Sequence, residues 1–381
     1  MAVQIRRNSG GRNNDGNPRG AHSAGQRHAG DPGLCRADRA SERLDGRRFS
    51  PADYSVDLNA AQLRDIAAAI RSIKAAGIGL GGLQRDHFEV PSLRPVVEEI
   101  RRQAEDGRGF ELLRRLPIED YSKDDLALIF WGVGTHLGRG LSQSVLGDRL
   151  GHVQDFSRED PGARAYRNKQ ELSPHTDSCD LVGLLCLRNA QAGGGVSRLT
   201  SAISVHNTLL AEHPDVLAAL YRGYVRHRRG EEQPGELPYT PYRIPVYSNV
   251  EGKVSARYVR SYIEAGEAAV GRPMGPAELA VIDTFEAVTK RLELMLEFTL
   301  QPGEAYFINN YTILHARTAF DDGDAPEDAR RHLLRLWLDA RRSARRWSGR
   351  EFAGLRHLVL HNLNFVILPV PPRHAFSADA V

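Results

Sequence analysis

The chain has 381 residues and a formal net charge of +3, with 41% hydrophobic and 26% charged residues. This length allows one large domain or two ordinary ones, and the composition is that of a soluble globular protein with a substantial core. The small net charge gives no reason to expect a nucleic-acid partner, and no run of about 18 apolar residues predicts a membrane-spanning helix.

Residues 1–50 differ from the rest of the chain. They hold ten Arg and five acidic residues and almost no large apolar side chains. Such a segment cannot offset the entropy of ordering its backbone, so we expect a disordered basic extension. It is either an arm that binds nucleic acid or another anion or, more simply, a dispensable extension. Its start lacks the apolar core of a secretory signal.

Three cysteines, Cys35, Cys179 and Cys186, are irregularly spaced. An odd number without a pattern argues against a disulfide framework or a zinc site built on cysteines. The cysteines therefore favour a reducing compartment, and we expect a cytoplasmic protein.

Residues 51–350 contain no internal repeat and no Gly/Ser linker, which favours one domain over this range. Early in it, apolar residues recur at three- and four-residue spacing, as in amphipathic helices. The run GFELLRRL, closed by Pro117, instead predicts a strand. The expected elements are helices at Ala60–Ala76, Leu93–Ala104 and Asp124–Leu137 and a strand at Gly109–Leu116.

After residue 170 the pattern changes to short strands separated by turn residues. Early helices followed by many short strands indicate a mainly β protein, in which an antiparallel double-sheet barrel carries helices on its outside. Residues 351–381 give no clear structural expectation. The elements expected here are strands at Val182–Arg188, Val196–Ile203, Tyr242–Ser248, Glu297–Leu300, Ala305–Ile308, Thr312–Ala316 and Leu333–Leu338 and a helix at Pro276–Met295.

The segment ELSPHTDSCD contains His175 and Asp177, two residues apart. In an extended chain such residues point to the same side, so both can reach one metal ion. A third ligand must come from far away in sequence, and His315, a lone polar side chain among β-formers, is the best candidate. Two histidines and one carboxylate leave coordination positions open for iron(II) chemistry with dioxygen. The HxD pattern alone is a weak signal. A lone histidine in a strand, such as His315, is also more often a core residue than a ligand.

Arg331 and Arg335 follow His315 in the run RRHLLRLWL. The alternation of a strand puts both arginines on the same face, with Leu333 between them. A guanidinium that faces into a barrel is an uncompensated charge unless an anion joins it, and it binds a carboxylate through two hydrogen bonds. The alternative is that Arg331 pairs with a carboxylate of the preceding loop, DDGDAPED.

These segments together resemble the taurine dioxygenase superfamily of iron(II)- and 2-oxoglutarate-dependent oxygenases, which includes γ-butyrobetaine hydroxylase and clavaminate synthase. The matching pieces are HTD, the GG-x-S stretch from Gly194 to Ser197, PGE-x-x-x-I-N-N-x-x-x-L-H-A-R, and R-x-x-x-R. They run from about residue 110 to 340 in the family's order and roughly its spacing. Two departures are Pro174, directly before the first histidine, and the stretch HNLNFVILPVPPRH, which has no counterpart.

The resemblance implies a double-stranded β-helix, the jelly-roll core of cupin-like proteins, with iron(II) held by His175, Asp177 and His315. It also implies that Arg331 binds the distal carboxylate of 2-oxoglutarate and that the hydroxyl of Ser197 assists. Arg317 matches a common arginine of the family to which no role is assigned.

The implied activity is that of a 2-oxoglutarate-dependent dioxygenase. With O2 it would hydroxylate an unactivated C–H bond of a small polar or acidic, amino-acid-like substrate and release succinate and CO2. The carboxylate of Asp177 favours hydroxylation over halogenation, since the halogenases of this class have a small residue there. The alternatives are a desaturase or cyclase of the same family, a catalytically inactive jelly-roll binding protein, and a zinc hydrolase with the same ligands.

Three residues are candidates for substrate binding. Arg335 matches a position that faces the acid group of the substrate in several relatives, or it braces the surroundings of Arg331. Asn168 and Tyr166 lie on a stretch that often borders the substrate. Trp131 and Trp337 fit core positions better than a role at a cofactor. A small-molecule substrate is the only partner that the sequence predicts, and the sequence gives no indication of the oligomeric state.

Overall fold

The computed structural model describes residues 44, 49–143, 147–157, 167–232, 234–250, 252–340 and 368–369. All of them belong to one compact unit, Gly33–Val381. The predicted disorder of residues 1–50 and the unassigned tail 351–381 lie almost entirely outside the described residues, and Tyr166 lies outside them too. No helix in the described ranges is long and apolar enough to cross a membrane.

The larger sheet forms one wall of the core. Its strands are ordered β1-β2-β12-β6-β14-β3, and β4 also pairs with β14. All neighbours are antiparallel except β1 and β2. The central strand β6 is apolar and buried from Leu181 to Leu187, since neighbours pair with it on both sides and both of its faces are covered. The strands are β1 (Ser55–Asp57), β2 (Phe110–Arg114), β3 (Arg139–Gly140), β4 (Leu150–Val153), β6 (Leu181–Arg188), β12 (Ala305–Asn309) and β14 (His332–Asp339).

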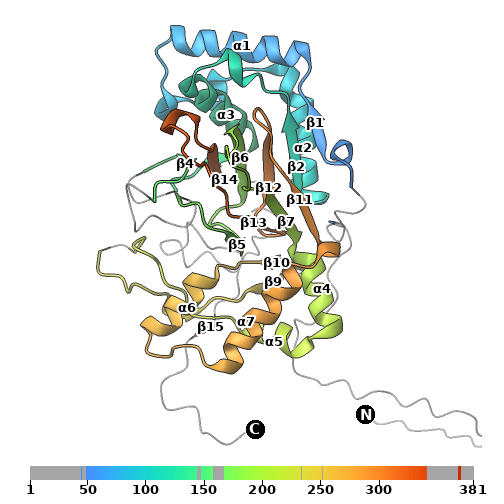
Figure 1. The fold of residues 1–381 in the computed structure, drawn as a ribbon, viewed down its shortest axis with the longest axis vertical. Coiled ribbons are helices and arrows are strands. Elements are labelled where there is room, and N and C mark those ends of the chain that lie inside the picture. Colours follow the sequence, from blue (N-terminus) through green and yellow to red (C-terminus); the bar gives the residue numbers. More distant parts are fainter. Residues whose placement is uncertain are drawn as a thin grey trace, which may run out of the picture. The chain divides into compact units, whose positions relative to one another are not determined.

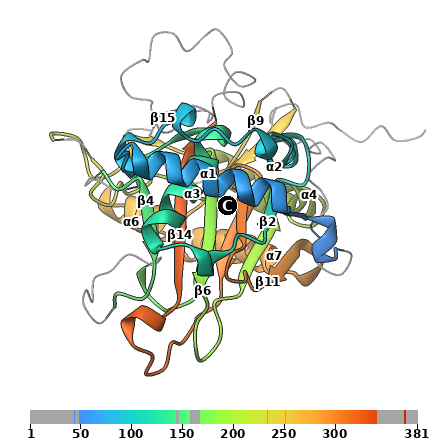
Figure 2. The same ribbon diagram turned by 90° about the horizontal axis from the view of Figure 1, so that it is seen from above.

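Helices α2 (Arg94–Asp106) and α3 (Lys123–Leu137) pack against the outer face of this sheet, and α1 (Ala60–Ala75) packs against α3. Figure 1 shows them beside β2, β6 and β14, and Figure 2 shows α1 lying across the strands. Asn59 caps α1 by accepting hydrogen bonds from the backbone N–H groups of residues 61 and 62. The cap fixes the residue at which α1 begins.

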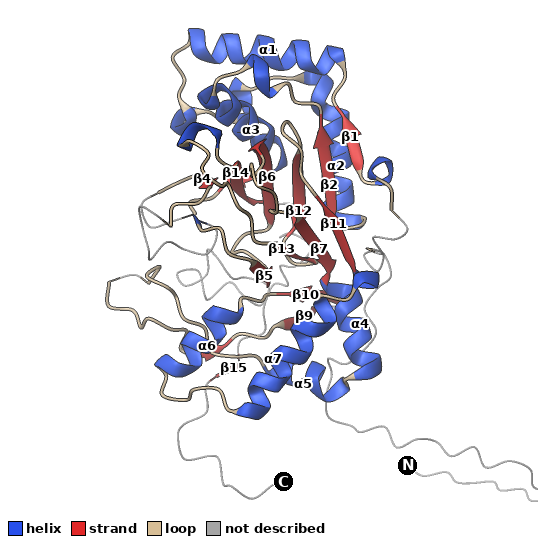
Figure 3. Ribbon diagram, in the orientation of Figure 1, coloured by secondary structure: helices blue, strands red, loops and turns tan. Residues whose placement is uncertain are grey.

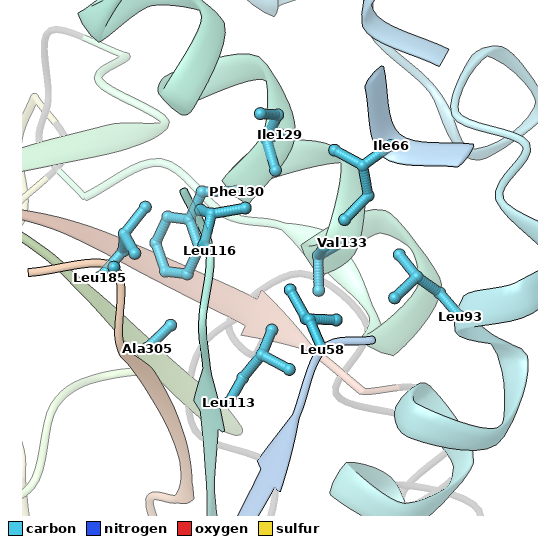
Figure 4. A pocket seen from close by; sticks show the side chains of 11 residues that line it. Leu58, Ile66, Leu93, Leu113, Leu116, Ile129, Phe130, Val133, Leu185 and Ala305 are labelled. Carbon is cyan, nitrogen blue, oxygen red and sulfur yellow. The ribbon is translucent and has the colours of Figure 1, made fainter. Parts of the chain in front are cut away.

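Aliphatic and aromatic side chains fill the interface between these helices and the sheet. Burying one such side chain fully contributes about 1.5–3 kcal/mol to stability. Figure 4 shows a small apolar pocket in this interface, so its lining belongs to the core and not to a polar site. The pocket is lined by Ile66, Leu93, Ile129, Phe130 and Val133 from the helical side and by Leu58, Leu113, Leu116, Leu185 and Ala305 from the sheet side.

The smaller sheet, ordered β11-β7-β13-β5, positions the histidines. It consists of β5 (Leu172–His175), β7 (Ser197–Ser201), β11 (Met295–Phe298) and β13 (Ile313–Arg317). Its register pairs His315 of β13 with His175 of β5, and the register then shifts before Arg317. Buried side chains from both sheets form one hydrophobic cluster, including Leu199 and Ile313 from the smaller sheet and Leu184 and Tyr306 from the larger. The two sheets thus pack face to face, as in a jelly roll.

Residues between β7 and β11 form a helical lobe with its own apolar cluster. Figure 3 shows its helices gathered around the β9–β10 hairpin. β15, described by its backbone alone, pairs with β8 in this lobe. The elements are α4 (Ala202–Glu212), α5 (Pro214–Arg222), α6 (Arg260–Ala269), α7 (Pro276–Thr289), β8 (Tyr242–Arg243), β9 (Tyr247–Val250), β10 (Lys253–Ala256) and β15 (Leu368–Pro369).

Most predicted elements are present, but three predictions are wrong in extent. The strand predicted at Val196–Ile203 ends at Ser201, whose hydroxyl caps α4 by accepting from Ser204 N at 3.2 Å. The strand predicted at Tyr242–Ser248 is two strands, β8 and β9, separated by a segment that contains Pro245. The helix predicted at Pro276–Met295 ends at Thr289, and Met295 begins β11.

Candidate active site

His175, Asp177 and His315 form one cluster, as the sequence predicts. One ligand atom from each lies within 4.8 Å of the other two. Asp177 Oδ1 is 3.9 Å from His175 Nε2, and Asp177 Oδ2 is 3.7 Å from His315 Nε2. His175 Nδ1 donates to the carbonyl of Ser173 at 2.9 Å, which leaves Nε2 unprotonated on the side of the cluster. Within the described residues, this is the one group of three with metal-ligand spacing.

The backbone around Asp177 is held from two directions. The side chain of Asn310 accepts from Asp177 N at 2.7 Å and donates to the carbonyls of Asp177 and Cys179. On the other side, Thr176 and Tyr258 exchange hydrogen bonds between Thr176 N and Tyr258 O and between Tyr258 N and Thr176 Oγ1. Asp177 therefore lies just past the end of β5, in a fixed turn and not within a strand.

The electrostatics favour the protonation states that bind a metal. Burial, reinforced by His175, lowers the pKa of His315 to about 3, and burial also lowers the pKa of His175. Burial opposes ionisation of Asp177, but Arg335, His315 and His175 outweigh it and lower the pKa of that carboxyl. At neutral pH the cluster therefore presents two neutral imidazoles and one carboxylate, as a divalent metal requires.

A polar pocket adjoins the cluster and is lined by His175, His315, Arg331 and Ser197, among others. Arg331 is 3% exposed, and its Nη1 is buried without a hydrogen-bond partner. The alternative, a pairing of the Arg331 guanidinium with a carboxylate of the preceding loop, is not formed. Asp322 Oδ1 accepts from the backbone N–H of Arg331 instead, and among the described residues no carboxylate forms an ion pair with the guanidinium. The pocket thus offers an unpaired cation, beside the hydroxyls of Ser197 and Tyr306, to an anion.

Arg331, Leu333 and Arg335 all line this pocket, so the predicted common face is confirmed, although the strand pairing shifts register beside Arg331, between residues 332 and 333. Arg335 Nη1 lies 3.5 Å from Asp177 Oδ2, and its Nε donates to Gln143 Oε1 at 2.8 Å. The charge of Arg335 is therefore partly countered by the same carboxylate that completes the cluster.

The structure does not bring the side chain of Asn168 into the pocket. Its Oδ1 accepts from the backbone N–H of Gln170 at 3.1 Å, and its backbone carbonyl accepts from Arg317 Nη2 at 3.0 Å. Arg317, to which the resemblance assigns no role, lines the pocket and packs over the ring of Phe320. Arg317 thereby ties the strand that carries His315 to the chain just before β5.

Sequence reasoning missed several residues of the site. Trp337, interpreted as a core residue, donates from Nε1 to Asp177 Oδ2 at 2.9 Å, so that interpretation is incomplete. Tyr306 lines the pocket, and burial raises the pKa of its hydroxyl, which keeps the group protonated. Asn310 and Tyr306 both lie in the motif that ends at His315, a signal that could have drawn attention to them. Nothing local marks Gln143, which reaches Arg335 from 192 positions away.

The donor set fits an iron(II) ion with an anionic cosubstrate. Two neutral imidazoles and one carboxylate are the donor types of the facial triad that would hold iron(II), as in non-haem iron oxygenases. The buried, unpartnered Nη1 of Arg331 on the pocket wall needs an anion, which such a cosubstrate supplies. The fit to iron(II) and to an anion follows from the chemistry of these side chains.

The chain matches the family model described as taurine catabolism dioxygenase TauD, TfdA family, over residues 73–337. The FR-33289 synthase of Streptomyces rubellomurinus is 32% identical over 293 residues, which cover 76% of this chain and 84% of that protein. The taurine hydroxylase-like protein SAT17 of Stachybotrys chartarum is 28% identical over 307 residues, which cover 76% of this chain and 77% of that protein.

Solved structures resemble the fold. A crystal structure of asparagine oxygenase in complex with Fe(II), 2S,3S-3-hydroxyasparagine and succinate gives a TM-score of 0.59 at 17% identity and covers 78% of this chain and 97% of that one. The non-heme iron oxygenase OrfP in complex with Fe and alpha-ketoglutaric acid gives 0.55 at 15% identity, with 77% and 97% covered. The double-stranded β-helix expected from the sequence is confirmed by this likeness.

Proposed function

Because the chain belongs to the taurine catabolism dioxygenase TauD, TfdA family, we propose that His175, Asp177 and His315 hold its iron(II) and that Arg331 and Ser197 bind 2-oxoglutarate. The protein is a 2-oxoglutarate-dependent non-haem iron dioxygenase. With 2-oxoglutarate and O2, the bound iron supplies the oxidising power that hydroxylates a C–H bond, and succinate and CO2 are released. The observation that carries the residue assignment is the approach of three ligand atoms within 4.8 Å beside a buried, unpaired guanidinium.

Each protein residue has a physical task in this proposal. Asp177 contributes the negative charge that iron(II) requires, and Trp337 and Asn310 hold its carboxylate and backbone in place. Arg331 provides a fixed cation for the distal carboxylate of 2-oxoglutarate, and its burial excludes the water that would screen this attraction. Ser197 and Tyr306 each offer a hydroxyl donor to the same wall of the pocket.

We propose a small polar or acidic, amino-acid-like substrate. Two structures that share the fold are described with hydroxylated amino acids, namely 3-hydroxyasparagine in asparagine oxygenase and (3S)-hydroxy-L-Arg in OrfP. Arg335 is a predicted contact to an acid group of the substrate, and Asp177 counters part of its charge. The assignment of Asn168 rests on its backbone alone, because its side chain bonds within its own turn.

The proposal includes a reducing, cytoplasmic compartment. Its support is that Cys179 and Cys186 are buried free thiols, and burial raises the pKa of both. Protonated, buried thiols are inert as nucleophiles, so a structural role explains them.

The test is binding of iron(II) and 2-oxoglutarate under anaerobic conditions. We expect the wild-type protein to bind one iron(II) and to bind 2-oxoglutarate in an iron-dependent manner, whereas His175→Ala and Asp177→Ala lose both. His213→Ala is the matched control, since its side chain is 41% exposed at the start of α5. Retention of iron by both site variants would disprove the assignment. A substrate screen for succinate formation then identifies the molecule that is oxidised.

A further inference from the structure

Arg226 is a second buried arginine without a counter-ion, outside the pocket described above. It is 5% exposed, and its Nε and Nη2 atoms have no hydrogen-bond partner. Its backbone is fixed by two hydrogen bonds with Thr240. A buried, unpaired charge costs several kcal/mol, so its presence calls for a partner that the protein acquires.

The two unpartnered atoms lie on the same edge of the guanidinium. That edge binds the two oxygens of an oxyanion at once. Elsewhere in the protein, Arg102 uses these very atoms to bind Glu99, from Nε at 2.9 Å and from Nη2 at 2.6 Å. Arg226 therefore presents the same two-donor edge at 5% exposure, and neither donor forms a hydrogen bond.

The surroundings of Arg226 add positive charge. Arg257 acts on it electrostatically, and burial together with Arg257 lowers the pKa of Arg226. The other ionisable groups that act on it are Tyr262 and Tyr258. Among the described residues no carboxylate pairs with Arg226: Glu267 nearby accepts instead from Val225 N and Arg272.

Arg226 and Arg257 adjoin the cluster of His175, Asp177 and His315. Arg257 Nη2 donates to Ser178 Oγ at 2.9 Å, and Ser178 directly follows Asp177. The same chain segment is fixed to the cluster, since Tyr258 exchanges hydrogen bonds with Thr176. Arg257 and Tyr262, which both act on Arg226, are partly exposed, so polar side chains that solvent reaches lie beside the buried guanidinium.

We propose that Arg226, with Arg257 beside it, binds an oxyanionic group of the substrate, a carboxylate, sulfonate or phosphate, and so selects acidic substrates. This inference rests on the proposed function, because it treats the oxyanion as part of the molecule that is hydroxylated. It differs from the prediction for Arg335, whose charge Asp177 partly counters.

The test uses the full chain loaded anaerobically with iron(II) and saturating 2-oxoglutarate, so that the Arg331 pocket is occupied. Acetate, sulfate and inorganic phosphate are titrated in turn by calorimetry at constant ionic strength. We expect one-site binding of at least one of them, weakened about tenfold or more in Arg226→Gln, as the loss of a two-donor, charge-assisted contact of about 1.4 kcal/mol or more implies. The affinity for 2-oxoglutarate should stay within about twofold of wild type in this variant.

Arg222→Gln is the matched control, because Arg222 is an exposed arginine at the end of α5 and should leave oxyanion binding unchanged. If Arg226→Gln folds poorly, Arg226→Met replaces it, and the readout becomes the rise in Tm that the oxyanion causes in wild type and not in the variant. Equal oxyanion affinity in wild type and Arg226→Gln, or no oxyanion binding by the wild type, would overturn the inference.

The two proposals fail in different ways. The proposed function fails if the wild-type protein binds neither iron(II) nor 2-oxoglutarate. Oxyanion binding that depends on Arg226, measured on the unloaded protein, would then still support the anion site. Normal binding of iron(II) and 2-oxoglutarate, with oxyanion binding unchanged in the Arg226 variant, would overturn only the role of Arg226.

Discussion

Trp337 donates a hydrogen bond from its indole Nε1 to Oδ2 of Asp177 over 2.9 Å. The bond joins the last part of β14 to the turn after β5, two segments 160 positions apart. It fixes one carboxylate oxygen and leaves the other, Oδ1, on the side of His175. The orientation of the only anionic ligand in the cluster thus depends on a residue that is not itself a ligand.

Trp337→Phe should therefore weaken iron(II) binding by about tenfold or more while the protein stays folded, because the ring still packs but no longer orients the carboxylate. Anaerobic titration with iron(II) measures this. Trp131→Phe is the control: Trp131 donates an equivalent bond to Leu83 O in the α3 interface, so it should cost about 1 kcal/mol of stability without changing iron affinity. Equal iron affinity in both variants would refute the role of Trp337.

Asn310→Asp should disrupt the cluster more severely. The amide nitrogen donates to two carbonyls, Asp177 O and Cys179 O, and a carboxylate cannot donate to either. We expect a loss of about 2–4 kcal/mol in the free energy of unfolding and weaker iron binding. Chemical denaturation with and without iron(II) measures both effects. Asn309→Asp, which removes one donor to Ala104 O, should have a smaller effect on iron binding.

Arg331→Lys should raise the KM for 2-oxoglutarate by at least about tenfold, because a lysine keeps the charge but loses the planar pair of donors. Ser197→Ala should raise it less, by about threefold to tenfold, as expected for the loss of one hydrogen bond from an uncharged hydroxyl. Initial rates at varied 2-oxoglutarate measure both. An unchanged KM in Arg331→Lys would move the cosubstrate away from this arginine.

Glu111 makes stability depend on pH. It is 2% exposed on β2, its Oε2 has no hydrogen-bond partner, and burial raises its pKa from 4.5 to about 7 despite Arg108. The folded state therefore holds the proton more tightly than the unfolded state. The stabilisation is complete below pH 4.5 and is lost as the pH rises to about 7, by on the order of 3 kcal/mol in total. Glu111→Gln should remove this contribution to the pH dependence. The free energy of unfolding of the variant, relative to that of wild type, should therefore increase between pH 5 and pH 8 in urea titrations. A constant difference would contradict the prediction.

Much of the fold could be predicted from local patterns. The spacing of apolar residues in α1 and the apolar run of β6 can each be seen within a few consecutive residues. These patterns therefore predict the helix and the strand correctly. Helices α4, α5 and α6 were not predicted. α4 directly continues a strand, and the change of structure at Ser201 depends on one side-chain cap.

The sequence by itself determined the ligand types and their motifs: a histidine and a carboxylate two residues apart, a distant histidine, and an arginine after it. Short-range spacing and residue chemistry suffice for that, since they do not depend on how the chain folds back. Tertiary structure alone decided that β13 pairs with β5 in the register that joins His315 to His175. It also decided that Trp337 reaches Asp177 and that Arg226 is buried without a counter-ion. These relations join residues far apart in sequence, and only packing brings such residues together.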